Sequence, residues 1–142
     1  MKFWDSSAIV PLLVEQPVSA RAAQLFQDDP ELIVWWGARV ECVSAITRLE
    51  RETGIEAAAT SSALDRLSQF VDIWDEVQPT HGLRGTAQRL LRVHSLRAAD
   101  ALQLAAMVEV GAGEPRDLEV VCFDDRLTKA ALREGFRVTD AG

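Results

Sequence analysis

Four acidic residues that are far apart in the chain each lie beside or within an apolar segment. They are Asp5, Glu41, Asp100 and Asp124. Two carboxylates about 5 Å apart repel each other by roughly 3 kcal/mol at an effective dielectric constant near 20, so a cluster of four needs cations or protons to neutralise it. Hard divalent cations such as Mg²⁺ and Mn²⁺ favour oxygen ligands, lower the pKa of a bound water and hold a phosphate oxygen. If the fold gathers these residues, they predict metal-assisted chemistry on a phosphate.

Asp100 lies in a long run, Leu96–Met107, in which most residues are small or apolar. A helix over this run would end at Gly111. Asp100 would lie in its first turn, where a negative charge meets the positive end of the helix dipole. An isolated aspartate there needs no further role, but three other acids in comparable places favour a shared site. The stripe expected to face the core is Ala98, Ala101, Leu102, Ala105 and Val108.

Predicted strands alternate with predicted helices along the whole chain. Strands are expected at residues 1–4, 32–36 and 118–123, with shorter ones at Val77 and 136–138. Helices are expected at 8–14, from Pro17 to Asp28, at 38–53, 55–74 and 82–93, around Asp100 up to Gly111, and at 126–134. The first helix would have Pro11 in or near its first turn and Ser6 or Ser7 as its cap, and the apolar members of the helix at 38–53 are Val40, Val43, Ile46 and Leu49. This alternation predicts an α/β fold with a parallel sheet and helices on both faces. Ligands bind beyond the carboxyl ends of such strands, where Asp5 and Asp124 both lie.

The bulk properties fit one globular domain spanning residues 1–142. Apolar residues make up 48% of the chain and charged residues 26%, which are ordinary values. The apolar run Ile9–Val14 is too short for a signal peptide, and no uncharged stretch approaches a bilayer span, so we expect a cytoplasmic protein. Cys42 and Cys122 lie in apolar settings and are expected to be reduced, buried thiols. No Cys/His cluster suggests zinc.

The net charge of −7 disfavours a protein that coats nucleic acid through bulk charge. The charge is uneven, however, because residues 80–99 contain no acid and end directly at Asp100. One interpretation is a track of phosphate contacts leading to the acids, with Arg97 the nearest to substrate; the other is an exposed helix edge. The basic residues of this segment are Arg84, Arg89, Arg92, Arg97, His81 and His94.

Four segments together resemble a known family over nearly the whole chain. They are Phe3-Trp-Asp-Ser-Ser-Ala8, Val40-Glu-Cys-Val-Ser-Ala-Ile-Thr-Arg48, Leu96-Arg-Ala-Ala-Asp-Ala-Leu-Gln-Leu-Ala105 and Val121-Cys-Phe-Asp-Asp-Arg-Leu127. In order and spacing they resemble PIN-domain ribonucleases, specifically the VapC-type toxins of toxin–antitoxin pairs. The resemblance implies a PIN-like α/β/α sandwich and a Mg²⁺- or Mn²⁺-dependent endoribonuclease that leaves 5′-phosphate and 3′-hydroxyl ends. It also implies a homodimer and a VapB-like antitoxin that inserts a tail near the active site.

The resemblance also assigns residues to the site. Asp5, Glu41, Asp100 and Asp124 match the family's acidic positions, which would be both catalytic and metal-binding. The family often has Ser or Thr near the first acid, where Ser7 is the best match and Ser6 the second.

Two positions near the last acid need separate comment. Cys122 stands where the family commonly has Ser or Thr, and a thiol is a weak hydrogen-bond donor. The spacing to Arg126 favours Asp124 as the fourth acid, which leaves Asp125 as a candidate helix cap.

Trp35 and Trp36 end a predicted buried strand, and both are more typical of a core. Adjacent strand residues point to opposite faces. One of the two is therefore a candidate for a dimer or antitoxin surface.

Two alternatives use the same residues differently. A haloacid-dehalogenase-type phosphatase would use Asp5 as nucleophile, supported by Lys129 and the Asp124–Asp125 pair. That family has a second aspartate two residues after the first, where this chain has Ser7. The other alternative is a catalytically inactive PIN-like module that binds RNA or a protein, which the presence of all four acids disfavours.

Overall fold

The computed structural model describes residues 1–142 and contains one five-stranded sheet. Every neighbouring pair of strands is parallel, and the strand order is β3-β2-β1-β4-β5. The strands are β1 (Lys2–Trp4), β2 (Leu32–Trp35), β3 (Asp75–Val77), β4 (Glu119–Val121) and β5 (Arg137–Thr139). The central strands β1 and β4 pair Phe3 with Val120 and Trp4 with Val121, so their carboxyl ends lie side by side.

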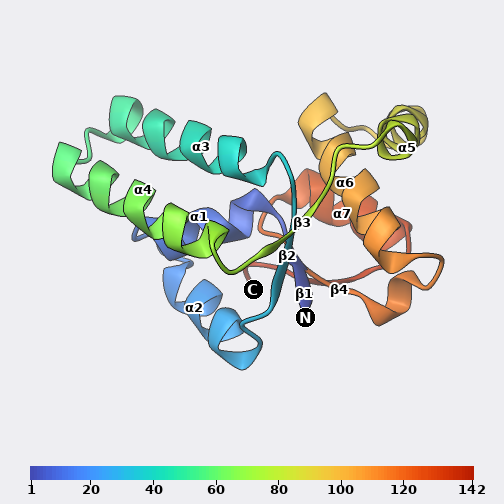
Figure 1. Ribbon diagram of the computed structural model, residues 1–142, viewed down its shortest axis with the longest axis horizontal. Coiled ribbons are helices and arrows are strands. Elements are labelled where there is room, and N and C mark those ends of the chain that lie inside the picture. Colours follow the sequence, from blue (N-terminus) through green and yellow to red (C-terminus); the bar gives the residue numbers. More distant parts are fainter.

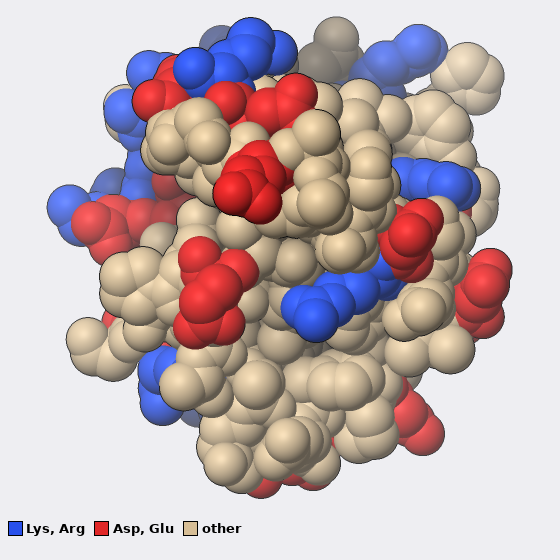
Figure 2. Space-filling model, turned by 90° about the vertical axis from the view of Figure 1, so that its left-hand side faces the viewer, with Lys and Arg blue, Asp and Glu red and all other residues tan.

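Helices cover both faces of the sheet, and the predicted α/β/α sandwich is confirmed (Figure 1). One face is covered by α1 (Ser6–Leu13), α2 (Ser19–Asp28), α3 (Ala38–Thr53) and α4 (Ala57–Val71). The other face is covered by α5 (His81–Leu91), α6 (Ala98–Gly111) and α7 (Asp125–Arg133). A short 3-10 helix spans Pro115–Asp117. No helix is both long and apolar enough to cross a membrane. On the face in Figure 2, basic and acidic side chains are interspersed and no continuous basic surface forms.

Two hydrophobic cores lie on opposite faces of the sheet because successive strand residues point in opposite directions. Phe3 packs in the core beneath α5, α6 and α7, whereas its neighbour Trp4 packs in the core beneath α1, α2, α3 and α4. Both side chains are fully buried. The short apolar strands are therefore covered on both faces, as parallel strands usually are.

Several local predictions were wrong at helix ends. The cap of α1 is Asp5 rather than a serine, since the Asp5 carboxylate accepts a hydrogen bond from the backbone N–H of Ser7. Pro11 lies in the second turn of α1 rather than the first. Helix α6 continues through Gly111 and ends at Ala112, which adopts a left-handed conformation with φ of 45°. A Cβ atom on Gly111 would lie 3.0 Å from the Phe136 ring, so Gly111 permits close packing.

Other boundaries differ by a few residues. Helix α2 begins two residues after Pro17, and α4 covers 57–71 instead of 55–74. Helix α3 has the predicted bounds, but it turns Ala38, Cys42 and Ile46 inward, and Val40 and Val43 are exposed. In α6 the expected stripe is only partly right, because the helix is enclosed by the sheet, α5 and α7 and Ala98 is exposed. Its buried residues are Ala101, Gln103, Leu104, Ala105, Ala106 and Met107.

Candidate active site

Asp5 lies at the carboxyl end of β1 and is only 4% exposed. Its carboxylate accepts a 3.0 Å hydrogen bond from the backbone N–H of Ser7 and a second, short one from the Ser7 hydroxyl. The Ser7 oxygen in turn accepts a 2.9 Å hydrogen bond from the backbone N–H of Phe123, beyond β4. Burial raises the pKa of Asp5 against the effect of the Ser7 hydrogen bonds, and the charges of Asp124 and Asp100 raise it further.

Glu41 approaches the same region from the first turn of α3. Its carboxylate accepts a hydrogen bond from the Ser6 hydroxyl at 3.1 Å and from the Gln103 side-chain amide at 3.2 and 3.3 Å. Burial raises the pKa of Glu41 to about 7, and the charges of Asp5 and then Asp100 add to the shift. A carboxyl group with a pKa near neutrality can exchange a proton under physiological conditions.

Gln103 is a site residue that the sequence analysis missed. It projects from α6, one turn after Asp100, and is 1% exposed. Its amide nitrogen serves both oxygens of Glu41, while its own oxygen has no hydrogen-bond partner. Gln103 is a polar side chain within the apolar run of α6, which could have marked it as a site residue, but the sequence analysis treated it only as part of a helix.

Asp100 lies in the first turn of α6, as expected, and Asp124 follows β4 as expected but also begins α7. Asp100 accepts a 3.3 Å hydrogen bond from the backbone N–H of Arg97, and Asp124 accepts a 2.8 Å hydrogen bond from the backbone N–H of Leu127. Asp124 is thus the N-cap of α7, and the suggestion that Asp125 caps this helix is wrong. Asp125 is instead the first residue of the helix, where its charge meets the helix dipole.

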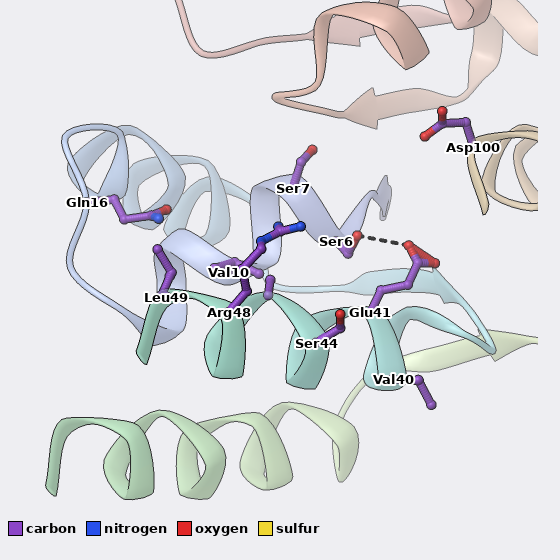
Figure 3. A pocket seen from close by; sticks show the side chains of 11 residues that line it. Ser6, Ser7, Val10, Gln16, Val40, Glu41, Ser44, Arg48, Leu49 and Asp100 are labelled. Atoms are coloured by element: carbon purple, nitrogen blue, oxygen red, sulfur yellow. Dashed lines mark hydrogen bonds between the residues drawn. The ribbon is translucent and has the colours of Figure 1, made fainter. Parts of the chain in front are cut away.

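Two cavities meet at Asp100. One, of about 590 Å³, lies between α1, α3 and α6, and Figure 3 shows Asp100 on the opposite side of it from Glu41. Its polar lining consists of Ser6, Ser7, Gln16, Glu41, Ser44, Arg48 and Asp100. The other, of about 600 Å³, is lined by Arg97, Ala99, Asp100, Phe123, Asp124, Asp125 and Arg126. The fold therefore brings all four predicted acids to one edge of the sheet.

Comparison with known proteins agrees with this geometry. Residues 2–133 match the PIN domain. The ribonuclease VapC45 of Mycobacterium tuberculosis is 32% identical over 148 residues, covering 98% of this chain and 94% of that protein. The chain belongs to the PIN-domain family. Its resemblance to VapC-type proteins is thereby confirmed, and the haloacid-dehalogenase alternative is wrong.

Solved PIN-fold structures share the architecture. The M. tuberculosis toxin VapC20, described as cleaving the sarcin–ricin loop, superimposes with a TM-score of 0.67 at 23% identity and covers 96% of each chain. A chain from a toxin–antitoxin complex of Klebsiella pneumoniae gives a TM-score of 0.61 at 12% identity and covers 87% of each chain. At these identities the comparison establishes the fold.

The carboxylates of this PIN domain fit a hard divalent cation in chemistry and are spaced more widely than a closed cage. No three His, Cys, Asp or Glu side chains lie close enough together to hold a metal ion directly. Mg²⁺ commonly takes only one or two protein carboxylates and keeps several waters, so the wider spacing is compatible with it. Burial raises the pKa values of Asp5 and Glu41, and repulsion between the acids adds to the shift; a bound cation would relieve this repulsion.

Cys122, two residues before Asp124, lies beside the Asp5–Ser7 arrangement. Its sulfur lies 3.8 Å from Asp5 Oδ2 and 3.5 Å from the Asp124 carbonyl oxygen. Burial raises the pKa of Cys122 to about 12, so the thiol stays neutral and donates only weakly. Ser7 is instead held by the backbone of Phe123. Cys42 and Cys122 are both buried and form no disulfide.

The four arginines predicted to contact RNA are not placed together. Arg97 borders the cavity that contains Asp100 and Asp124. Arg84 contacts the His81 ring at 2.8 Å, Arg89 lines a separate cavity beside Pro115 and Phe136, and Arg92 is exposed at the end of α5. Arg48 and Arg126, which the sequence analysis did not select, border the two acidic cavities.

Proposed function

We propose that this PIN-domain protein is a Mg²⁺- or Mn²⁺-dependent endoribonuclease that hydrolyses RNA phosphodiester bonds and acts as the toxin of a toxin–antitoxin pair. The observation that carries the proposal is that the fold brings four carboxylates to one edge of the sheet beside two adjoining cavities, where the charges of Asp124 and Asp100 add to burial in raising the pKa of Asp5. The ribonuclease name of VapC45, which aligns over 98% of the chain, supports the substrate class.

In this proposal Asp5, Asp100, Asp124 and Glu41 surround the cation, with one or two of them bound directly and the others holding it through its waters. When bound, it would supply an acidified water and positive charge against the phosphate oxygens. Ser7 keeps the Asp5 carboxylate in one orientation through two hydrogen bonds. Ser6 and Gln103 hold both oxygens of Glu41. Glu41, held by these hydrogen bonds, can accept a proton from the attacking water.

The arginines at the cavity rims would position the RNA. Arg97 and Arg126 lie with Asp100 and Asp124 around one cavity, and Arg48 lies near Glu41 in the other. Guanidinium groups bind phosphate oxygens in a bidentate way. They would therefore orient the backbone on either side of the acids.

The test is cleavage of total RNA by the purified protein with Mg²⁺ or Mn²⁺, with EDTA, and with an Asp100→Asn variant. The matched control is Asp65→Asn, which changes an exposed aspartate on α4. We expect discrete fragments from the wild type and the control, and none with EDTA or from Asp100→Asn. Equal cleavage by Asp100→Asn would contradict the assigned site. Absence of both cleavage and metal binding would favour the catalytically inactive binding module.

We further propose that the exposed start of α3 binds a protein partner, either the VapB-like antitoxin or a second copy in a homodimer. Trp35 is buried, whereas Trp36 is 49% exposed and Val40 is 68% exposed. Val40 also lines the cavity that contains Glu41. A protein covering this apolar surface would also cover the entrance to the acids. Light scattering of wild type and a Trp36→Ser variant, alone and with the antitoxin, tests both partners.

A further inference from the structure

A third cavity, of about 430 Å³, adjoins the acidic site on the side of α7. Asp125 and Arg126 line both this cavity and the one that contains Asp100 and Asp124, so the two are adjacent. We call it the His94 pocket. Its lining residues are His94, Ser95, Asp125, Arg126, Lys129, Ala130 and Arg133.

The charge of the His94 pocket is opposite to that of the acidic site. Arg126, Lys129 and Arg133 are spaced i, i+3 and i+7 along α7 and therefore lie on one face of the helix. None of the three forms an ion pair with an acidic side chain. Asp125 is the only acid in the lining. Three cationic side chains thus gather around one cavity of a chain whose net charge is −7.

His94 adds a buried polar side chain without a hydrogen-bond partner. The residue is 8% exposed, and neither ring nitrogen makes a hydrogen bond. Glu134 Oε1 lies 3.3 Å from Nε2, but not in hydrogen-bonding geometry. The backbone N–H of His94 donates a 2.9 Å hydrogen bond to the Leu90 carbonyl. Both ring nitrogens are shielded from solvent, so His94 borders the pocket as a nearby reporter of what binds there and does not itself contact a ligand.

We propose that the His94 pocket binds a phosphate group of the RNA backbone adjacent to the phosphate that is cleaved. Guanidinium and ammonium groups are the side chains that bind phosphate most strongly, and Arg126, Lys129 and Arg133 supply three of them around this pocket. Because Arg126 borders both this pocket and the acidic site, a phosphate of the bound RNA is favoured over a free anion. This inference rests on the proposed ribonuclease function and identifies where the strand runs beside the site.

The chain contains only two histidines, His81 and His94, which makes ring NMR signals a direct probe of the pocket. His81 is exposed and lines none of the three cavities, so it is the internal reference. The protein is titrated in EDTA with inorganic phosphate and, separately, with a single-stranded RNA oligonucleotide. We expect both titrants to shift the His94 signals in a saturable way and to leave those of His81 nearly unchanged.

The second measurement is RNA affinity as a function of salt for Arg133→Gln, with Arg51→Gln as matched control. Both arginines are exposed and lie in the last turn of a helix, but Arg51 borders none of these cavities. Loss of one phosphate contact should lower the slope of log affinity against log salt by about 0.7, which is roughly fivefold in affinity near 0.1 M salt. Arg51→Gln should change neither quantity.

Thermal melting and the His94 signals verify that Arg133→Gln is folded. Equal salt slopes for Arg133→Gln and Arg51→Gln, or a His94 signal that does not respond to RNA, would overturn the proposal. A response to inorganic phosphate without any effect on RNA affinity would mean a free-anion site and would also overturn it, as would stronger binding of an acidic peptide than of RNA. Because binding is measured in EDTA, these outcomes are independent of whether Asp100→Asn abolishes cleavage.

Discussion

Replacing Glu41 with glutamine should stabilise the fold above neutral pH, although it removes a proposed metal ligand. Burial and the charges of Asp5 and Asp100 raise the pKa of Glu41 from 4.5 to about 7. Between these values the folded state keeps a proton that the unfolded chain has lost. The contribution of Glu41 to the free energy of unfolding is therefore highest below pH 4.5, decreases as the pH rises to about 7, and stays low above it. A glutamine has no charge to bury, so the variant does not lose this stability as the pH rises.

The size of the effect follows from the shift itself. A rise from 4.5 to about 7 corresponds to about 3 kcal/mol at 1.36 kcal/mol per pKa unit. Glu41 retains some contact with solvent, which screens part of this energy, so we expect about 2 kcal/mol. For a chain of this length that is roughly 5–8 °C in melting temperature. Glutamine can keep both neighbours, accepting from Gln103 and donating to Ser6.

The assay is urea denaturation in EDTA at pH 5 and pH 8.5 for wild type, Glu41→Gln and Glu52→Gln. Glu52 is exposed on the same helix and controls for the loss of one charge. At pH 5 the unfolded wild type has already lost most of the Glu41 proton, so Glu41→Gln should be slightly more stable there and more stable by about 2 kcal/mol at pH 8.5. Mg²⁺ should then stabilise the wild type more than Glu41→Gln. If Glu41→Gln and Glu52→Gln show the same pH dependence, the assigned burial and coupling of Glu41 are wrong.

Three further outcomes are expected. Asp124→Ala should lower the free energy of unfolding by about 1 kcal/mol because it removes an N-cap, whereas Asp124→Asn keeps the cap. Both variants should lose RNA cleavage. Equal stabilities of the two variants in urea would contradict the cap assignment. Gln103→Leu removes the amide that favours ionised Glu41, so the acid limb of the pH–rate profile should move to higher pH. An unchanged profile with lower activity would indicate that Gln103 has only a packing role. Neither Cys42 nor Cys122 should react with a thiol reagent at pH 8 in the folded state, since burial raises the pKa of each to about 12; fast labelling before unfolding would refute this burial.

Helix interiors are easier to predict from the sequence than helix ends, because an end depends on one or two capping residues. The bounds of α3 follow from the sequence because Gly54, with φ of 67°, adopts the left-handed conformation that ends a helix and that glycine adopts without strain. At α1 the prediction was wrong, since Asp5 and Ser6 are equally good caps by residue type. The direction of the chain leaving β1 decides between them.

Which face of a helix is buried is also a tertiary outcome. The helix α3 has apolar side chains on more than one face, and packing against α1 and α4 selects Cys42 and Ile46 while Val40 remains exposed. The same holds for the adjacent tryptophans. The sequence required one to point outward, and the crossing of β2 beneath α6 buries Trp35 and exposes Trp36.

By itself the sequence determined that four carboxylates follow strands or begin helices, because local propensity and hydrophobic pattern are properties of neighbouring residues. Only the tertiary structure decided what surrounds those carboxylates. The hydrogen bond from Gln103 to Glu41 joins residues 62 positions apart, and the His94 pocket forms where the end of α5 meets α7. Such contacts, and the pKa shifts they cause, depend on how the helices pack across the sheet, which no local pattern encodes.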